Sequence, residues 1–225
     1  MPETPWYQPL PSILRRHAAL KAIGTTLFIS VFMVAYLQLL KAPLFPATEM
    51  PLTWFDRSLA FQPNALPIYL TLWLYVSLPP ALLQERAELQ LYGLAMTTVC
   101  LIGLACFLFW PTAVPATVID WDSYPGFVFL RAIDATGNAC PSLHVATAAF
   151  SALWIDRRLH ELAAGAGVRW GNWLWCLAIA YSTLAIKQHV LVDVLAGFAL
   201  GLAGAASSLH WRSLAVSRRQ QDALT

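Results

Sequence analysis

The chain carries near its N-terminus the stretch AIGTTLFISVFMVAYLQLL (residues 22–40), in which no side chain is charged. At about 1.5 Å per residue, a helix of this length nearly matches the ~30 Å hydrocarbon core of a bilayer. A secretory signal peptide has a shorter apolar region that ends at small residues, whereas this stretch ends at Lys41. The stretch therefore predicts a first membrane-spanning helix.

The chain as a whole is also strongly apolar. Hydrophobic residues make up 58% of the 225 and charged residues only 12%, which is far from the composition of a water-soluble domain. Pro79 and Pro80 are expected to kink or end the second helix, and the short fourth helix is expected to extend through residues 156–159. We predict an all-α bundle of about six transmembrane helices, the last five near residues 66–83, 91–110, 142–155, 173–186 and 189–209.

Basic residues fall mainly on one side of this predicted topology. One side receives Arg15, Arg16, Lys21, Arg86, Arg157, Arg158, Arg169, Arg212, Arg218 and Arg219, and the other receives Lys41, Arg57, Arg131 and Lys187. Because positive residues near helix ends are retained in the cytoplasm, both termini are predicted to be cytoplasmic. The predicted organisation is a cytoplasmic segment 1–18, a membrane domain 19–211 and a cytoplasmic tail 212–225, in the inner membrane of a bacterial-type cell.

Composition and motifs exclude several functional classes. The net charge of +2 is not gathered on a polar surface, so nucleic-acid binding is not expected. Three of the four cysteines lie in apolar runs and Cys140 lies alone in a loop, so a disulfide framework is not expected either. No nucleotide or flavin fingerprint is present, and we predict no cofactor. The sequence leaves the oligomeric state open.

Two predicted helix starts carry residues suited to chemistry, and both face the periplasmic or exterior side. His189 and Asp193 are four residues apart at the start of the sixth helix, so we expect them on one helix face. The carboxylate would fix the tautomer of the imidazole and leave its other nitrogen free as a nucleophile. An ionisable group such as Asp193 inside an apolar run is tolerated mainly with a partner, and we expect that partner to be His189.

The second start is Cys140-Pro141-Ser142-Leu143-His144, which opens the fourth helix. Backbone N–H groups at a helix N-terminus and the Ser142 hydroxyl are suited to bind a phosphate beside His144. A metal held by His144, His189 and Asp193 is an alternative, although Cys140 is the only further ligand on that side. We predict a metal-independent site; three other histidines, His17, His160 and His210, are expected to be ordinary interfacial residues.

Pro141-Ser142-Leu143-His144 followed by His189-x3-Asp193 resembles the second and third motifs of the type 2 phosphatidic acid phosphatase superfamily. In that family Pro-Ser-Gly-His and Ser-Arg-x5-His-x3-Asp lie on a six-helix membrane core. Leu143 in place of glycine resembles the branch of inositol phosphorylceramide synthases and related bacterial proteins. The resemblance covers residues 138–197 and is architectural elsewhere. It implies that His189 attacks phosphorus to form a phosphohistidine, Asp193 orients His189, and His144 protonates the leaving oxygen.

The sequence also departs from the family pattern. Thr183 stands where the third motif has arginine, and the first motif, Lys-x6-Arg-Pro, is absent, with residues 109–112 in its place. Lys187 and Arg131 are the basic residues expected to replace the missing phosphate-binding cations, together with Ser142. Fewer cations would suit a phosphodiester, which carries less charge than a phosphomonoester.

Three functions from different classes therefore stay open. The first is hydrolysis of a lipid phosphate or diphosphate, such as phosphatidate, phosphatidylglycerophosphate or a polyprenyl diphosphate. The second is transfer of a phospho head group to a lipid or polyol. The third is a non-catalytic lipid transporter or scaffold, in which His144 and His189 would tolerate replacement. Soluble vanadium-dependent haloperoxidases share the motif pattern, but the apolar composition argues against them.

Overall fold

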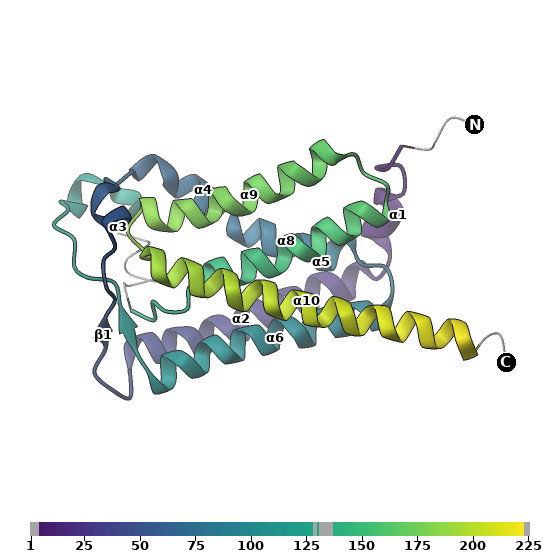
Figure 1. Cartoon of the computed structure of the whole chain (residues 1–225), viewed down its shortest axis with the longest axis horizontal. Helices are drawn as coiled ribbons and strands as arrows, with labels where there is room; N and C mark the ends of the chain where they lie inside the picture. The colour runs from purple at the N-terminus through teal and green to yellow at the C-terminus, as the bar shows by residue number, and fades with distance from the viewer. Residues whose placement is uncertain (1–4, 128–129, 131–136, 223–225) are drawn as a thin grey trace.

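Long helices lying side by side along one axis form the body of the molecule (Figure 1). The structure is a computed structural model that describes residues 5–127, 130 and 137–222. The long helices are α2 (Ala18–Lys41), α5 (Leu72–Leu82), which continues the short α4 (Leu66–Leu70), α6 (Arg86–Phe109), α8 (Leu143–Glu161), α9 (Ala166–Ala185) and α10 (Leu191–Asp222). Short elements complete the described chain: α1 (Leu10–Arg15), α3 (Trp54–Ser58), η1 (Pro63–Ala65), η2 (Trp121–Ser123), β1 (Thr48–Glu49) and β2 (Thr112–Ala113).

The prediction of an all-α membrane protein is confirmed. Four segments of the described chain are long and apolar enough to cross a bilayer: Ala18–Lys41, Pro63–Leu82, Arg86–Phe109 and Leu191–Ser213. Helix α8 lies at the centre of the bundle and packs against α5, α6, α9 and α10. Its side chains therefore meet protein rather than lipid, and it does not need the apolar surface of a lipid-facing helix.

The second predicted helix ends close to where it was expected to end, but it also contains a break that the sequence did not predict. The break between α4 and α5 falls at Thr71, whereas Pro79 and Pro80 lie inside α5. Pro80 has no N–H to donate to the carbonyl of Val76, and the Tyr92 hydroxyl of α6 lies 3.5 Å from that oxygen. A neighbouring helix thus supplies a donor for the freed carbonyl, and α5 continues through both prolines before it ends at Leu82, close to the expected end near residue 83.

Other helix ends also differ from the expected ones. Helix α6 begins at Arg86 rather than near residue 91, and α10 begins at Leu191 rather than His189 and continues past residue 211 to Asp222. The expected extension of the fourth helix is confirmed, because α8 reaches Glu161. Arg157 and Arg158 both pair with Glu161 in its last turns, and such pairs at three and four residues stabilise a helix end.

Glycines bring α10 against α8. A Cβ atom on Gly197 would lie 2.4 Å from the Ser142 carbonyl oxygen, and one on Gly201 would lie 2.2 Å from that of Ala146. Only glycine permits this backbone separation. The backbone N–H of Ser142 donates to the carbonyl of Asp193 at 3.0 Å, so the close approach joins the starts of the two helices that carry the motifs.

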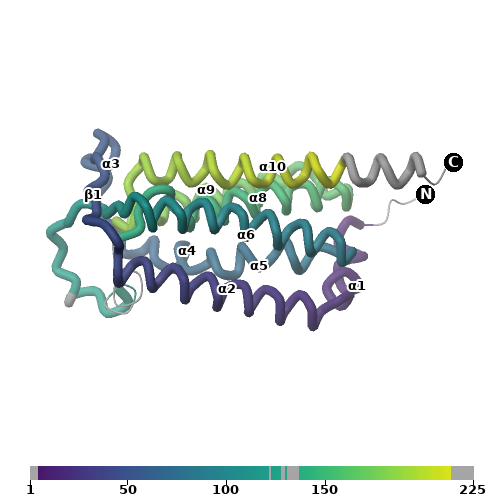
Figure 2. Tube along the Cα trace, turned by 90° about the horizontal axis from the view of Figure 1, so that it is seen from below, coloured from purple at the N-terminus to yellow at the C-terminus, as the bar shows by residue number. Residues whose placement is uncertain are grey.

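The two ends of the bundle differ. The N- and C-termini lie together at one end, while β1, α3 and the starts of α8 and α10 lie at the other (Figures 1 and 2). The arrangement agrees with an even number of crossings and places both motifs at the end opposite the termini.

Candidate active site

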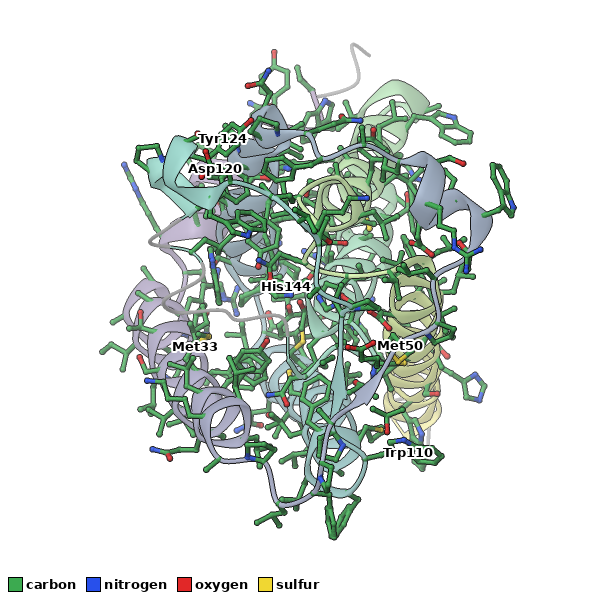
Figure 3. The ribbon with its side chains drawn as sticks, turned by 90° about the vertical axis from the view of Figure 1, so that its left-hand side faces the viewer. Met33, Met50, Trp110, Asp120, Tyr124 and His144 are labelled. Carbon is green, nitrogen blue, oxygen red and sulfur yellow. The ribbon has the colours of Figure 1, made fainter. Side chains whose placement is uncertain are left out.

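His144 stands in the first turn of α8, near the middle of the end of the bundle shown in Figure 3. Ser142 caps this helix, because its hydroxyl accepts a hydrogen bond from the N–H of Val145 at 3.3 Å. The preceding loop is held by Thr112, whose hydroxyl accepts from the N–H of Cys140 at 2.8 Å. Residues 109–112, which replace the first motif of the family pattern, thus help to fix the loop that leads to His144.

His189 lies in the connection between α9 and α10, and its side chain is buried. The backbone N–H groups of Gln188 and His189 donate to the carbonyl of Thr183 at 3.0 and 3.2 Å, which holds the connection against the end of α9. We expected His189 and Asp193 on one helix face; instead, His189 precedes the helix. The pair still meets, because the turn that starts α10 brings the imidazole back over the carboxylate.

Asp193 is fully buried in the first turn of α10. Its Oδ2 accepts from the N–H of Val190 at 3.0 Å, which caps the helix, and lies 3.5 Å from Nδ1 of His189. That separation is at the outer limit of a hydrogen bond. His189 Nδ1 and Asp193 Oδ1 have no hydrogen-bond partner within the described chain, so a movement of a few tenths of an ångström would pair the imidazole with the carboxylate.

The two histidines contact each other directly. His144 Nδ1 lies 3.2 Å from His189 Nε2, and the other nitrogen of His144, Nε2, lies 2.7 Å from the hydroxyl of Tyr69 in α4. Asp193, His189, His144 and Tyr69 therefore form a continuous row of polar groups. A carboxylate only accepts, so pairing with Asp193 would place the His189 proton on Nδ1 and leave a lone pair on Nε2, the state of a nucleophile.

The other predicted phosphate-binding residues are placed differently. The ammonium of Lys187 donates to the carbonyl oxygens of Asp56, at 3.3 Å, and Leu59, both in the α3 segment. Burial lowers the pKa of Lys187, and the nearby Asp56 carboxylate opposes this shift. The Ser142 hydroxyl is fully buried in its capping role. Arg131 lies outside the described residues. Phosphate binding by these three residues remains a prediction.

Tyr69 and Asp56 are site residues that the sequence did not reveal. Tyr69 is one aromatic residue in an apolar run, and 75 residues separate it from His144. Asp56 lies in α3, and its Oδ1 accepts from the N–H of Leu191 at 2.8 Å. No motif or periodicity signals such contacts, because they depend on how distant helices pack.

The acidic and sulfur ligands near the site do not gather in the manner of a metal centre. No three His, Cys, Asp or Glu side chains of the described residues are arranged to hold a metal ion. Burial, with a further contribution from the charge of Asp193, raises the pKa of the Cys140 thiol to about 11. Cys140 is therefore a neutral thiol at physiological pH.

An apolar cavity of about 860 Å³ leads away from the site between α2, α4, α5, α6 and α8. His144 and Tyr69 line one end of it, and Lys21 and Arg86 line the other. Between them the wall consists largely of apolar side chains, among them Phe28, Phe32, Met33, Trp73 and Met96. The cavity thus connects a polar site at one end of the bundle with the apolar interior of the membrane region.

The sequence matches a family model. Residues 92–216, more than half of the 225, match the PAP2 superfamily. No curated protein and no solved structure is significantly similar to the chain. The matched segment contains α8, α9 and most of α10 with His144, His189 and Asp193, and the chain therefore belongs to the PAP2 superfamily.

Proposed function

We propose that this protein is a membrane phosphatase that hydrolyses a lipid phosphate or diphosphate through a phosphohistidine on His189. Membership of the PAP2 superfamily indicates phosphatase or phosphotransferase chemistry. The observation that carries the proposal is the row Asp193, His189, His144 at the mouth of an apolar cavity. The row supplies a nucleophile beside a proton donor, and the cavity can accept a hydrocarbon chain.

In the first step, Nε2 of His189 attacks phosphorus and the bond from phosphorus to the leaving oxygen breaks. Protonated His144 donates the Nδ1 proton to that oxygen, because this nitrogen faces the atom that attacks. Asp193 holds the imidazole of His189 and compensates the positive charge that develops on it. A phosphoryl group must enter where the two histidines now touch, so His144 moves away from His189 on binding.

In the second step, water attacks the phosphohistidine and the bond between nitrogen and phosphorus breaks. His144, neutral after the first step, takes the proton from the water. Inorganic phosphate leaves, and both histidines return to their starting states. The N-terminus of α8 supports this cycle, since a helix start favours an anion at this position.

Transfer of the phosphoryl or phospho head group to an alcohol is a second candidate. The observation in its favour is Lys187, whose ammonium is held by the carbonyls of Asp56 and Leu59. A site with fewer cations suits a phosphodiester, which carries one negative charge. In this reaction an acceptor hydroxyl would replace water in the second step, with the same roles for His189 and His144.

We also propose that the site faces the periplasm or exterior of a bacterial-type inner membrane, within a membrane domain of residues 19–211. Basic residues lie at the end of the bundle opposite the motifs: Arg16 follows α1, Arg158 stands in the last turn of α8, and Arg212 pairs with Glu161 there. Positive residues favour the cytoplasmic side.

The test is phosphate release from a panel of lipid phosphates by the purified full-length protein in EDTA, with and without diacylglycerol or polyol acceptors. His189→Ala should abolish turnover and His144→Ala should reduce it by about 10²- to 10⁴-fold. His210→Ala is the matched control, since His210 is exposed far along α10. Acid-labile, alkali-stable phosphate on the wild-type protein would identify the phosphohistidine.

The remaining outcomes separate the alternatives. Acceptor-dependent product without free phosphate would establish the transferase. Turnover that is lost in EDTA and restored by a divalent metal would overturn the metal-independent mechanism. No turnover on any substrate, together with lipid binding that survives His189→Ala, would show a non-catalytic lipid-binding protein.

A further inference from the structure

We propose that Tyr69 is a positioning residue of this active site, which holds the imidazole of His144 in the orientation and tautomer needed for proton transfer. The inference rests on the proposed function and extends it to a residue outside the matched segment 92–216. Tyr69 belongs to α4, in the N-terminal half of the chain.

The geometry fixes the ring of His144 from both sides. The Tyr69 hydroxyl lies 2.7 Å from Nε2, and the two rings pack with centroids 5.0 Å apart. On the opposite edge, Nδ1 of His144 lies 3.2 Å from Nε2 of His189. Tyr69 is itself only 3% exposed, so its hydroxyl cannot turn freely to water. An imidazole bonded through both nitrogens can neither flip nor turn without losing a partner.

The direction of the hydrogen bonds follows from Asp193, which can only accept. His189 directs its Nδ1 proton toward Asp193 and presents a lone pair on Nε2. His144 must then place a proton on Nδ1 to meet that lone pair, which leaves a lone pair on its own Nε2. The Tyr69 hydroxyl donates to this last lone pair. If neutral His144 carried its proton on Nε2 instead, the lone pairs of His144 Nδ1 and His189 Nε2 would face each other across 3.2 Å.

A hydroxyl suits this position because it can both donate and accept. It donates to Nε2 while His144 is neutral, before His144 takes up from solvent the proton that the first step uses. When His144 is protonated on both nitrogens, the hydroxyl accepts from Nε2–H, and it continues to do so after Nδ1 gives its proton to the leaving oxygen. His144 then holds a lone pair on Nδ1, the nitrogen that faces the reacting group, and can take the proton from water. Phenylalanine offers neither interaction.

The ring of Tyr69 is held by a buried cluster of apolar side chains. Its ring packs with Ala65, Phe127 and Leu130 in one buried cluster, so Phe at this position should keep the packing and remove only the hydroxyl. Tyr75 offers a matched control in the adjoining helix, α5. It is also fully buried, and its hydroxyl donates to Asn172 at 2.7 Å, away from the two histidines.

The experiment compares two soluble substrates, an alkyl phosphate and 4-nitrophenyl phosphate, in the full-length protein. The alkoxide leaving group needs a proton from His144, whereas nitrophenolate leaves without one. For Tyr69→Phe we expect kcat on the alkyl ester to fall by about 10- to 100-fold, as is typical when a group that orients a reacting residue is lost. The nitrophenyl ester should change much less. Tyr75→Phe should leave the ratio of the two rates as in the wild type.

Each outcome bears on one claim. Equal rates for Tyr69→Phe and the wild type, or an equal loss on both esters, would overturn the role of Tyr69 while leaving the proposed function intact. If the wild type turned over neither these esters nor any lipid phosphate, the proposed function itself would fail. Should Tyr69→Phe not fold, 3,5-difluorotyrosine at position 69 keeps the ring and the hydroxyl but makes the phenol more acidic. A several-fold change in the ratio of rates is then expected, and an unchanged ratio would again overturn the role.

Discussion

The carboxylate of Asp56 accepts a hydrogen bond from the backbone N–H of Leu191 at 2.8 Å, although 135 residues separate them. Its other oxygen accepts from the N–H of Thr53 at 2.8 Å and from the Thr53 hydroxyl. Asp193 meanwhile caps the N–H of Val190. Two carboxylates thus satisfy adjacent N–H groups at the start of α10, directly beside His189.

Asp56→Ala should destabilise the protein and disturb the site together. It removes the Asp56 half of the capping box of α3, in which Thr53 is the N-cap, and leaves the N–H of Leu191 without its carboxylate, a loss of about 2–4 kcal/mol. Thermal unfolding in detergent should show a clear fall in Tm, accompanied by slower turnover. Asp120→Ala is the control, since this exposed carboxylate accepts, among the described residues, a side-chain hydrogen bond from the nearby Ser123 alone. Equal Tm values for the two variants would contradict the structural role of Asp56.

Lys187 should act mainly on stability. Its ammonium bonds the carbonyls of Asp56 and Leu59 and thereby fastens the α3 segment to the connection before His189. Lys187→Met should therefore lower Tm, with little change in KM once the folded fraction is taken into account. Substrate titrations at matched folded concentration measure this. An unchanged Tm with a KM raised tenfold or more would instead assign the ammonium to phosphate binding.

How far the sequence could predict the site depends on the distance between partners along the chain. His189 and Asp193 are close in sequence, so spacing alone paired them, even though His189 precedes the helix that was expected to contain it. His144 was placed with them because both motifs begin helices at the same end of the bundle. Tyr69 joins His144 from an apolar run that carries no polar pattern, and only the packing of α4 against the bundle brings it there.

Helix ends are likewise hard to predict from sequence where they depend on contacts between distant segments. The apolar runs predicted the four described segments that are long and apolar enough to span a bilayer, since charge-poor length is read directly from the sequence. Pro79 and Pro80 were expected to kink or end the second helix, which ends at Leu82, but the sequence did not predict the break at Thr71 or the Tyr92 hydroxyl of α6 beside the carbonyl freed by Pro80. Likewise, Arg212 pairs with Glu88 and Glu161 from two other helices, which supports α10 beyond its apolar part. These contacts join residues that are far apart in the sequence, so the sequence pattern alone does not reveal them.

Asp193→Asn should impair catalysis more than folding. The side-chain oxygen of an asparagine can still accept from the N–H of Val190 and cap the helix. Its amide NH₂ would take the place of the other carboxylate oxygen in the buried site, and the negative charge would be lost. His189 would lose the group that fixes its tautomer, and turnover should fall by about 10²- to 10⁴-fold. Steady-state rates and trapping of the phosphoenzyme measure this. Asp156→Asn is the control, because that carboxylate pairs with Arg169 at the opposite end of the bundle; equal activity of both variants would remove Asp193 from the mechanism.

The Cys140 thiol should react slowly, although it lies directly before the motif Pro141-Ser142-Leu143-His144. With a thiol pKa of about 11, only about one molecule in a thousand carries the thiolate at pH 8. Since the thiolate is the reactive form, iodoacetamide at pH 8 should inactivate the protein slowly, and faster as the pH rises toward 11. Cys140→Ala should keep its turnover in EDTA. Loss of activity in this variant, restored by a divalent metal, would instead point to a metal bound through Cys140.

The apolar cavity predicts a dependence on chain length that one glycine can test. Gly93 lines the cavity, and a Cβ atom placed on it meets nothing within 4 Å. Leu143, the neighbour of His144, packs against Gly103, so Gly93 lies ten residues, or about 15 Å, deeper along α6. That depth is about half the hydrocarbon core, the reach of one lipid chain. A leucine at position 93 should therefore obstruct long chains and leave short ones unaffected.

We expect Gly93→Leu to slow hydrolysis of long-chain phosphatidate by about 5- to 150-fold, which corresponds to the ~1–3 kcal/mol cost of overfilling an apolar site. A six-carbon alkyl phosphate cannot reach position 93 and should react as with the wild type. Gly171→Leu makes the same change at an open, exposed position of α9 outside the cavity. Equal losses on long and short substrates would indicate a general disturbance of α6. No loss on either would show that the lipid chain lies outside the cavity, against the bilayer face of the bundle.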